Sequence, residues 1–233
     1  MKKYIPNTIT CCSLASGFIA GVMALQGEFF NVVIWVMLAA LFDFMDGFAA
    51  RLLKAFSPIG KELDSLSDVI SFGVAPGLML YESLRLVALH LPLGSYNTWV
   101  PYMACVIPVF SALRLAKFNI DDRQTTSFLG LPVPAHALFW TSILYAVRPW
   151  MQAYPVVFAV SAILLACASS LLLVSEVPMF SLKIKSLSWK GNELRYLLVG
   201  CAILFVVLWG ILGIAGTILL YVILSLLNRY CHV

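Results

Sequence analysis

The sequence predicts an all-α fold, a single polytopic bundle of about eight transmembrane helices that forms one domain over residues 1–233. The mean hydropathy is +0.96, with 62% hydrophobic and only 11% charged residues, and a soluble protein could not bury so much apolar surface. Apolar runs of roughly 17 to 25 residues also recur along the chain, which is the length that crosses a bilayer as an α-helix.

Charged residues, proline and glycine divide the apolar runs and so delimit the expected helices. The first run, after Lys2 and Lys3, has no small-residue cleavage site, and we expect a retained helix rather than a signal peptide. The last two runs are short, so a single tilted or broken helix is an open alternative there. The predicted spans are residues 8–26, 30–51, 62–82, 98–117, 132–148, 154–175, 195–210 and 213–228.

The lysines and arginines predict the orientation of the chain. If the N-terminus is cytoplasmic, every Lys and Arg except Arg85 and Arg148 falls on the cytoplasmic side, as the positive-inside rule requires. In a seven-helix arrangement only Arg229 would change sides, from the cytoplasmic to the outer side of the membrane. We therefore expect an integral protein of the inner cell membrane with both termini cytoplasmic. The net charge of +4 reflects this topology and indicates no nucleic-acid partner.

Four aspartates, Asp43, Asp46, Asp64 and Asp68, stand out against the apolar background. Carboxylates at the edge of hydrocarbon are costly unless they face a cavity, a partner or a metal. Asp43 and Asp46 are three residues apart at the cytoplasmic end of the second predicted helix, and Asp64 and Asp68 are four apart on the third. Each pair therefore lies on one helix face, and the two antiparallel helices would bring all four carboxylates together.

Such a cluster of like charges needs protonation or a compensating cation. The cysteines and histidines show no zinc-ligand spacing, whereas carboxylates favour magnesium, manganese or calcium, and a shared cluster suits two divalent ions about 4 Å apart that bind phosphate oxygens. Gly47 and Ala50 would leave room for a nucleotide or diphosphate. Alternatively, the aspartates cap helices or pair with Arg51, Lys54 and Lys61, which does not explain their spacing on two consecutive helices.

This spacing resembles a known family signature. Residues 43–68 match every fixed position of D-x-x-D-G-x-x-A-R-x8-G-x-x-x-D-x-x-x-D, the signature of the CDP-alcohol phosphotransferases. The resemblance implies a helical membrane core with a cytoplasmic active site and two divalent cations, Mg²⁺ or Mn²⁺. It also implies the role of each residue: Asp43, Asp46 and Asp64 as metal ligands, Asp68 as metal ligand and general base, and Gly47, Ala50, Arg51 and Gly60 as contacts of the CDP group.

Three further stretches resemble the membrane-integral phosphatidylserine synthases within this family: residues 6–10, residues 68–76, and residues 114–119 with 128–135. In the first, Asn7 and Thr10 match an N-x-x-T element that in relatives precedes the first span and contacts the nucleotide and its phosphates. The alternative is that Asn7 or its neighbour Thr8 only caps the first helix.

The resemblance implies L-serine as the acceptor, held by its ammonium and carboxylate groups with its hydroxyl near Asp68. Arg114 is the candidate partner of the carboxylate, because a guanidinium binds a carboxylate through two hydrogen bonds. Ser71 is expected to face the same cavity, and Asn119 and the turn at residues 130–132 are expected to close its cytoplasmic mouth. For Arg114 the alternative is ordinary anchoring at the membrane interface.

The sequence thus predicts an enzyme that transfers the phosphatidyl group of CDP-diacylglycerol to L-serine and releases CMP. Its partners would be these two substrates and the lipid bilayer, with a homodimer as an option for its assembly. The alternatives are a sibling phosphotransferase that uses glycerol phosphate, inositol phosphate or another alcohol, a cation-coupled transporter, and a purely structural subunit. The position of the aspartates at helix ends, with no second copy, disfavours the transporter.

Overall fold

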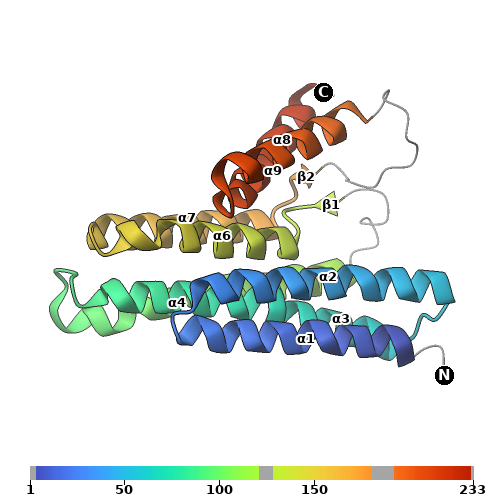
Figure 1. The fold of residues 1–233 in the computed structure, drawn as a ribbon, viewed down its shortest axis with the longest axis horizontal. Coiled ribbons are helices and arrows are strands. Elements are labelled where there is room, and N and C mark those ends of the chain that lie inside the picture. Colours follow the sequence, from blue (N-terminus) through green and yellow to red (C-terminus); the bar gives the residue numbers. More distant parts are fainter. Residues whose placement is uncertain (1–3, 121–127, 180–191, 232–233) are drawn as a thin grey trace.

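The computed structural model describes residues 4–120, 128–179 and 192–231. Most of its helices run along one common direction, and a hairpin of two helices near the C-terminus is inclined to them (Figure 1). In chain order the helices are α1 (Tyr4–Leu25), α2 (Phe29–Leu53), α3 (Pro58–Asp68), the π-helix η1 (Val69–Val74), α4 (Ala75–Ala88), the 3₁₀-helix η2 (Gly94–Cys105), α5 (Val106–Ile120), α6 (Val133–Met151), α7 (Pro155–Val174), α8 (Glu193–Trp209) and α9 (Leu212–Cys231).

The predicted all-α fold is confirmed. The only β structure in the described parts of the chain is a two-residue antiparallel pair between β1 (Phe128–Leu129) and β2 (Pro178–Met179). The last two helices are separate, because the chain turns at Gly210 and α9 packs back on α8 so closely that a Cβ atom on Gly213 would overlap the Phe205 backbone. The alternative of one broken helix is therefore excluded.

Five helical segments within the described residues are long and apolar enough to cross a membrane, so the chain is an integral membrane protein. One of them combines α3, η1 and α4, and another combines η2 with α5. The helices α6, α8 and α9 are present where spans were expected, but they do not reach the same length and hydropathy, so the count of eight spans stays a prediction. The five segments are Tyr4–Leu25, Phe29–Leu53, Pro58–Ala88, Gly94–Ile120 and Pro155–Val174.

Small residues and hydroxyl groups hold α1 against its neighbours. A Cβ atom on Gly17 would overlap Ser71 of η1, so the two helices approach closely at this point. The Ser71 hydroxyl donates a hydrogen bond to the Ser13 carbonyl (3.0 Å), and the Ser13 hydroxyl donates to the Ala39 carbonyl of α2 (3.0 Å). Close packing and interhelical hydrogen bonds are the main attractions between helices in lipid, where the hydrophobic effect contributes little.

The second layer of the bundle covers the first. Figure 1 shows α6 and α7 lying over α2 and α4, with the α8–α9 hairpin resting on α6 through α9. Large buried side chains such as Phe29, Phe72 and Trp140 fill the space between the helices. His136 is also fully buried and bonds to the Ser169 hydroxyl (2.9 Å), so it packs in this core.

The turn between α2 and α3 is set by local sequence. Lys54 adopts the left-handed conformation (φ 50°) that ends α2, and Pro58 occupies the start of α3. The Ser57 hydroxyl caps α3 by accepting a hydrogen bond from the Gly60 N–H (3.1 Å). Both α2 and α3 then pack on α1, which places their polar faces near each other at this end of the bundle.

Candidate active site

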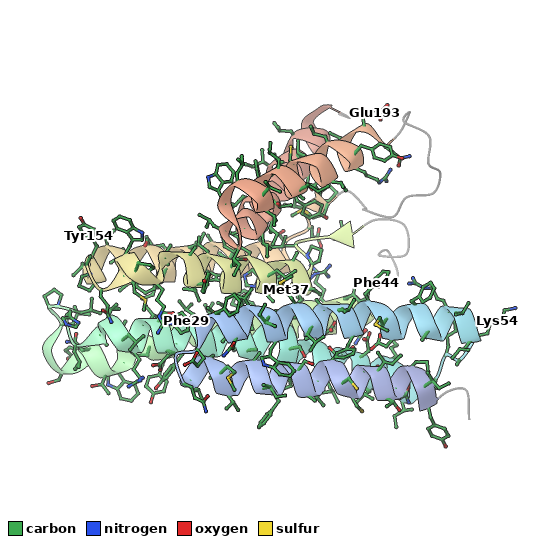
Figure 2. All side chains as sticks on the ribbon, in the orientation of Figure 1. Phe29, Met37, Phe44, Lys54, Tyr154 and Glu193 are labelled. Carbon is green, nitrogen blue, oxygen red and sulfur yellow. The ribbon has the colours of Figure 1, made fainter. Side chains whose placement is uncertain are left out.

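The carboxylates of Asp43, Asp64 and Asp68 come together between α2 and α3. One oxygen atom of each lies within 4.8 Å of the others, and all three residues are half-buried. Figure 2 labels Phe44 and Lys54 at this end of α2; Asp43 directly precedes Phe44, and Asp46 lies between the two labelled residues in the sequence. The structure therefore brings three of the four predicted metal ligands to one point.

Asp46 lies beside this group and is the most buried of the four aspartates, with 6% of its surface exposed. Thr10 of α1 lines the same cavity as Asp46, and its hydroxyl donates a hydrogen bond to the Pro6 carbonyl (3.1 Å). Oδ2 of Asp46 and Oδ1 of Asp68 are buried and have no hydrogen-bond partner within the described residues. A buried carboxylate oxygen without a donor is costly, so these two atoms are suited to a cationic partner.

The cluster has the right donor atoms for a divalent metal ion. Where the structure is described, the ion pairs join Arg85 to Glu82 and Lys117 to Glu176, and neither pair involves the cluster. Oxygen atoms of carboxylates are the ligands that magnesium and manganese prefer. The chain can therefore hold a metal ion at this point.

A cavity of about 230 Å³ opens beside Asp46, and we call it the Asp46 cavity. The predicted nucleotide contacts Asn7, Thr10, Gly47, Ala50 and Gly60 all line it. A Cβ atom on Gly47 would project into open space, whereas one on Gly60 would lie 2.9 Å from Oδ1 of Asn7. Because Gly47 and Gly60 have no side chains, the cavity stays wide. The full lining is Pro6, Asn7, Thr10, Asp46, Gly47, Ala50, Ala55, Phe56, Ser57, Gly60, Lys61 and Asp64.

Two groups of residues differ from the sequence prediction here. Arg51 is exposed and does not line the cavity, although the signature assigned it a CDP contact. Conversely, Phe56, Ser57 and Lys61 line the cavity and were not predicted as contacts. Their position in the sequence could have revealed them, because the turn that joins two signature helices has to border the site between them.

A second cavity, of about 150 Å³, lies between the end of α3, α5 and the start of α6, and we call it the Asp68 cavity. Arg114 lines it together with Asp68, as the sequence predicted. Arg114 is only 4% exposed, and its guanidinium carbon lies 5.6 Å from the centre of the Phe118 ring. The full lining is Asp68, Arg114, Leu115, Phe118, Pro132, Val133 and Pro134.

Asn119 and Gly130 support the walls of the Asp68 cavity. The Asn119 amide donates a hydrogen bond to the Ser65 hydroxyl (2.8 Å), which ties the end of α5 to α3. The Gly130 N–H donates to the Val177 carbonyl (2.8 Å), which ties the chain before α6 to the chain after α7. Gly130 has a φ of +76°, and a Cβ atom there would overlap the Leu173 carbonyl. Both residues therefore hold the wall of the Asp68 cavity in place but do not line the cavity.

Ser71 lies at neither cavity, which corrects the expectation that it would face the acceptor. It is fully buried and donates its hydrogen bond to Ser13 of α1. The physical reason is the π-helix that begins directly after Asp68: a π-helix has more residues per turn, so residue 71 does not return to the face of residue 68. Ser71 contributes to the packing of η1 on α1.

Residues 3–174 match the sequence family described as CDP-alcohol phosphatidyltransferase. The chain is also 32% identical to the CDP-diacylglycerol–serine O-phosphatidyltransferase of Bacillus subtilis, over 75% of this chain and 89% of that protein. Proteins of the same name from Mycobacterium leprae (31% identical, 76% of this chain, 58% of that protein) and Helicobacter pylori (37%, 57% and 54%) are similar too. Because the family match runs from α1 to the end of α7, the chain belongs to the CDP-alcohol phosphatidyltransferase family.

Proposed function

We propose that this protein transfers the phosphatidyl group of CDP-diacylglycerol to L-serine and so forms phosphatidylserine and CMP. The observation that carries the proposal is that Asp68 belongs to the carboxylate cluster and also lines a cavity together with a buried arginine. A single carboxylate can therefore reach both the acceptor and the reacting phosphorus. The names of the relatives from Bacillus subtilis and Helicobacter pylori support serine as the acceptor.

The head group of the donor would occupy the Asp46 cavity, with its acyl chains in the bilayer. Asn7 and Thr10 offer hydrogen-bonding groups at the start of α1, while Gly47 and Gly60 leave room for the nucleotide beside the helix backbone. The diphosphate would then lie toward Asp64, at the border between this cavity and the cluster. Arg51 is outside the cavity lining, and its contact with the CDP group stays a prediction.

The four signature aspartates would hold two divalent cations, Mg²⁺ or Mn²⁺. When bound, such ions neutralise the phosphate charge that develops as CMP departs. The two buried carboxylate oxygens without hydrogen-bond donors, on Asp46 and Asp68, are the strongest support for this assignment.

The acceptor would enter the Asp68 cavity. Arg114 would bind the carboxylate of serine through two hydrogen bonds, with its guanidinium held against Phe118. Asp68 would accept the proton of the serine hydroxyl as the serine oxygen bonds to the phosphorus that carries diacylglycerol. The bond from that phosphorus to the CMP oxygen breaks, and CMP departs. The protein contributes mainly by holding the reacting atoms together.

The lining of the Asp68 cavity favours serine over a phosphorylated acceptor. Among the residues that the structure describes, Arg114 is the one cationic residue that lines it. Lys117, one turn further along α5, instead bonds to the Val174 carbonyl (3.2 Å) and pairs with Glu176. A single guanidinium suits a carboxylate, whereas a phosphate ester would be better held by several cations.

The charge distribution supports an orientation in which both cavities open to the cytoplasm of the cell, at its inner membrane. The Lys54 end of the bundle carries the aspartates and the cationic residues of both cavities, as the positive-inside rule requires of a cytoplasmic face. Serine and CMP would then be exchanged with the cytoplasm. Assembly as a homodimer stays a prediction.

The test is an acceptor panel. Purified protein is supplied with CDP-diacylglycerol, Mg²⁺ or Mn²⁺, and labelled serine, glycerol phosphate, inositol phosphate or ethanolamine, and both CMP and labelled lipid are measured. We expect phosphatidylserine and CMP in equal amounts with serine. Lipid labelled only by another alcohol would replace serine with that acceptor, and no CMP release with any alcohol would overturn the enzymatic function itself.

A further inference from the structure

Lys61 occupies a distinctive position in the first turn of α3. It is the one cationic residue among the described residues that line the Asp46 cavity. The cavity otherwise presents carboxylates, hydroxyl groups, one amide and apolar surface. A ligand with a diphosphate therefore meets a single ammonium group here, and the family signature does not include it.

The ammonium group of Lys61 has only a weak partner in the structure. Nζ lies 3.5 Å from the main-chain carbonyl oxygen of Asn119, and neither of the ion pairs described above includes it. That carbonyl belongs to the last turn of α5, where carbonyls lack helical donors and favour a cation. A hydrogen bond of this length is weak, whereas one to a phosphate oxygen is charge-assisted and stronger.

The same contact reaches the helix that carries Arg114. Asn119 lies five residues after Arg114 on α5, and its amide group also bonds to Ser65 of α3. Lys61 therefore connects the lining of the Asp46 cavity with the end of the helix that forms one wall of the Asp68 cavity. A change in its partner can act on both cavities.

We infer that Lys61 binds a phosphate of the nucleotide in the Asp46 cavity and thereby couples the two cavities. Its ammonium group leaves the Asn119 carbonyl for a phosphate oxygen, and the end of α5 then adjusts so that Arg114 closes on the acceptor. By linkage, the acceptor strengthens nucleotide binding by the same factor. The identity of the acceptor rests on the proposed function, but the contact between Lys61 and phosphate does not.

The test measures CDP affinity by titration calorimetry in detergent with Mn²⁺, with and without saturating L-serine. For the unaltered protein we expect serine to tighten CDP binding by about 5-fold, which is within the usual range of coupling between sites. Lys61→Met should weaken CDP binding by about 10-fold, the usual cost of a hydrogen bond to a charged group, and should abolish the effect of serine. Lys61→Arg should restore both properties, because it keeps the charge and the reach.

Lys54→Asn is the matched control. It removes the same charge from the same end of the bundle, and asparagine tolerates the left-handed conformation found at this position. Normal CDP binding and a normal serine effect in Lys61→Met would overturn the inference. Weaker CDP binding with an intact serine effect would overturn the coupling. If the unaltered protein did not bind CDP, the proposed function would fail as well, so the two failures are distinguishable.

Discussion

The Asp46 cavity and the Asp68 cavity share the carboxylate cluster as their border, yet they are built differently. Among the described residues, the lining of the Asp46 cavity comes from positions 6 to 64, which belong to three consecutive helices and the turn between the last two. The Asp68 cavity takes its walls from residue 68, residues 114–118 and residues 132–134, which are brought together by packing across the bundle. The proposed nucleotide site therefore depends on local spacing, whereas the proposed acceptor site depends on long-range contacts.

Asp68 offers the strongest test of this division, because it belongs to the cluster and lines only the second cavity. We expect Asp68→Asn to lower CMP release by on the order of 10³-fold, since the serine hydroxyl loses its general base. CDP affinity should stay within a few-fold, because Asp68 does not line the Asp46 cavity and the other three signature aspartates remain to hold a cation. CMP release and CDP titration measure the two effects, and normal turnover in this variant would rule out the role of Asp68.

Substitution of Arg114 should affect the KM of the acceptor much more than the KM of the donor. Arg114→Met should raise the KM for serine by about 10- to 100-fold, since a buried hydrogen-bonded charge pair is lost, while the KM for CDP-diacylglycerol stays within about 2-fold. The variant should also discriminate less between serine and ethanolamine, which has no carboxylate. Steady-state kinetics with both acceptors gives these ratios. An equal rise of the KM for donor and acceptor would indicate a general disturbance instead.

Substitution of Gly47 tests whether the Asp46 cavity binds the nucleotide of the donor. Gly47→Leu should raise the KM for CDP-diacylglycerol by about 10-fold and leave that for serine unchanged, because Gly47 lines the Asp46 cavity and a leucine side chain would occupy the open space beside its Cα atom. Gly200→Leu is the matched control, since Gly200 also lies within a helix and has open space around its Cα atom, far from either cavity in the sequence. The KM for CDP-diacylglycerol should rise only in the Gly47→Leu variant. An equal KM in both variants would contradict the assignment of the Asp46 cavity to the donor.

The sequence was most informative where function depends on residues close together in the chain. The spacing of Asp43, Asp64 and Asp68 predicted their clustering, and the N-x-x-T element placed Asn7 and Thr10 in the cavity that the structure shows. The helix period decides which of the aspartates share a face, whereas the prediction for Asn7 and Thr10 came from the family resemblance. The all-α fold followed in the same way from the length and hydropathy of the apolar runs.

Sequence reasoning was less accurate where the backbone departs from a regular helix or where tertiary packing decides. Ser71 was placed by α-helical spacing, but the π-helix after Asp68 turns it toward α1. Arg51 lies at the same helix end but outside the cavity lining, so its contact with the CDP group stays a prediction. The pairing of β1 with β2, which positions the start of α6, joins segments about fifty residues apart, and no local pattern in the sequence indicates it.

Substitution of Gly130 has the smallest expected effect, and it tests the wall of the Asp68 cavity that long-range contacts hold in place. Gly130→Ala should raise the KM for serine by about 3-fold, because a Cβ atom would overlap the Leu173 carbonyl and displace the chain just before Pro132. The left-handed φ also costs alanine about 1–2 kcal/mol of stability. Gly94→Ala carries the same left-handed strain with open space around its Cβ, so it should lower the melting temperature but leave the serine KM unchanged. If both variants changed the serine KM equally, general strain rather than the position of this wall would control the acceptor site.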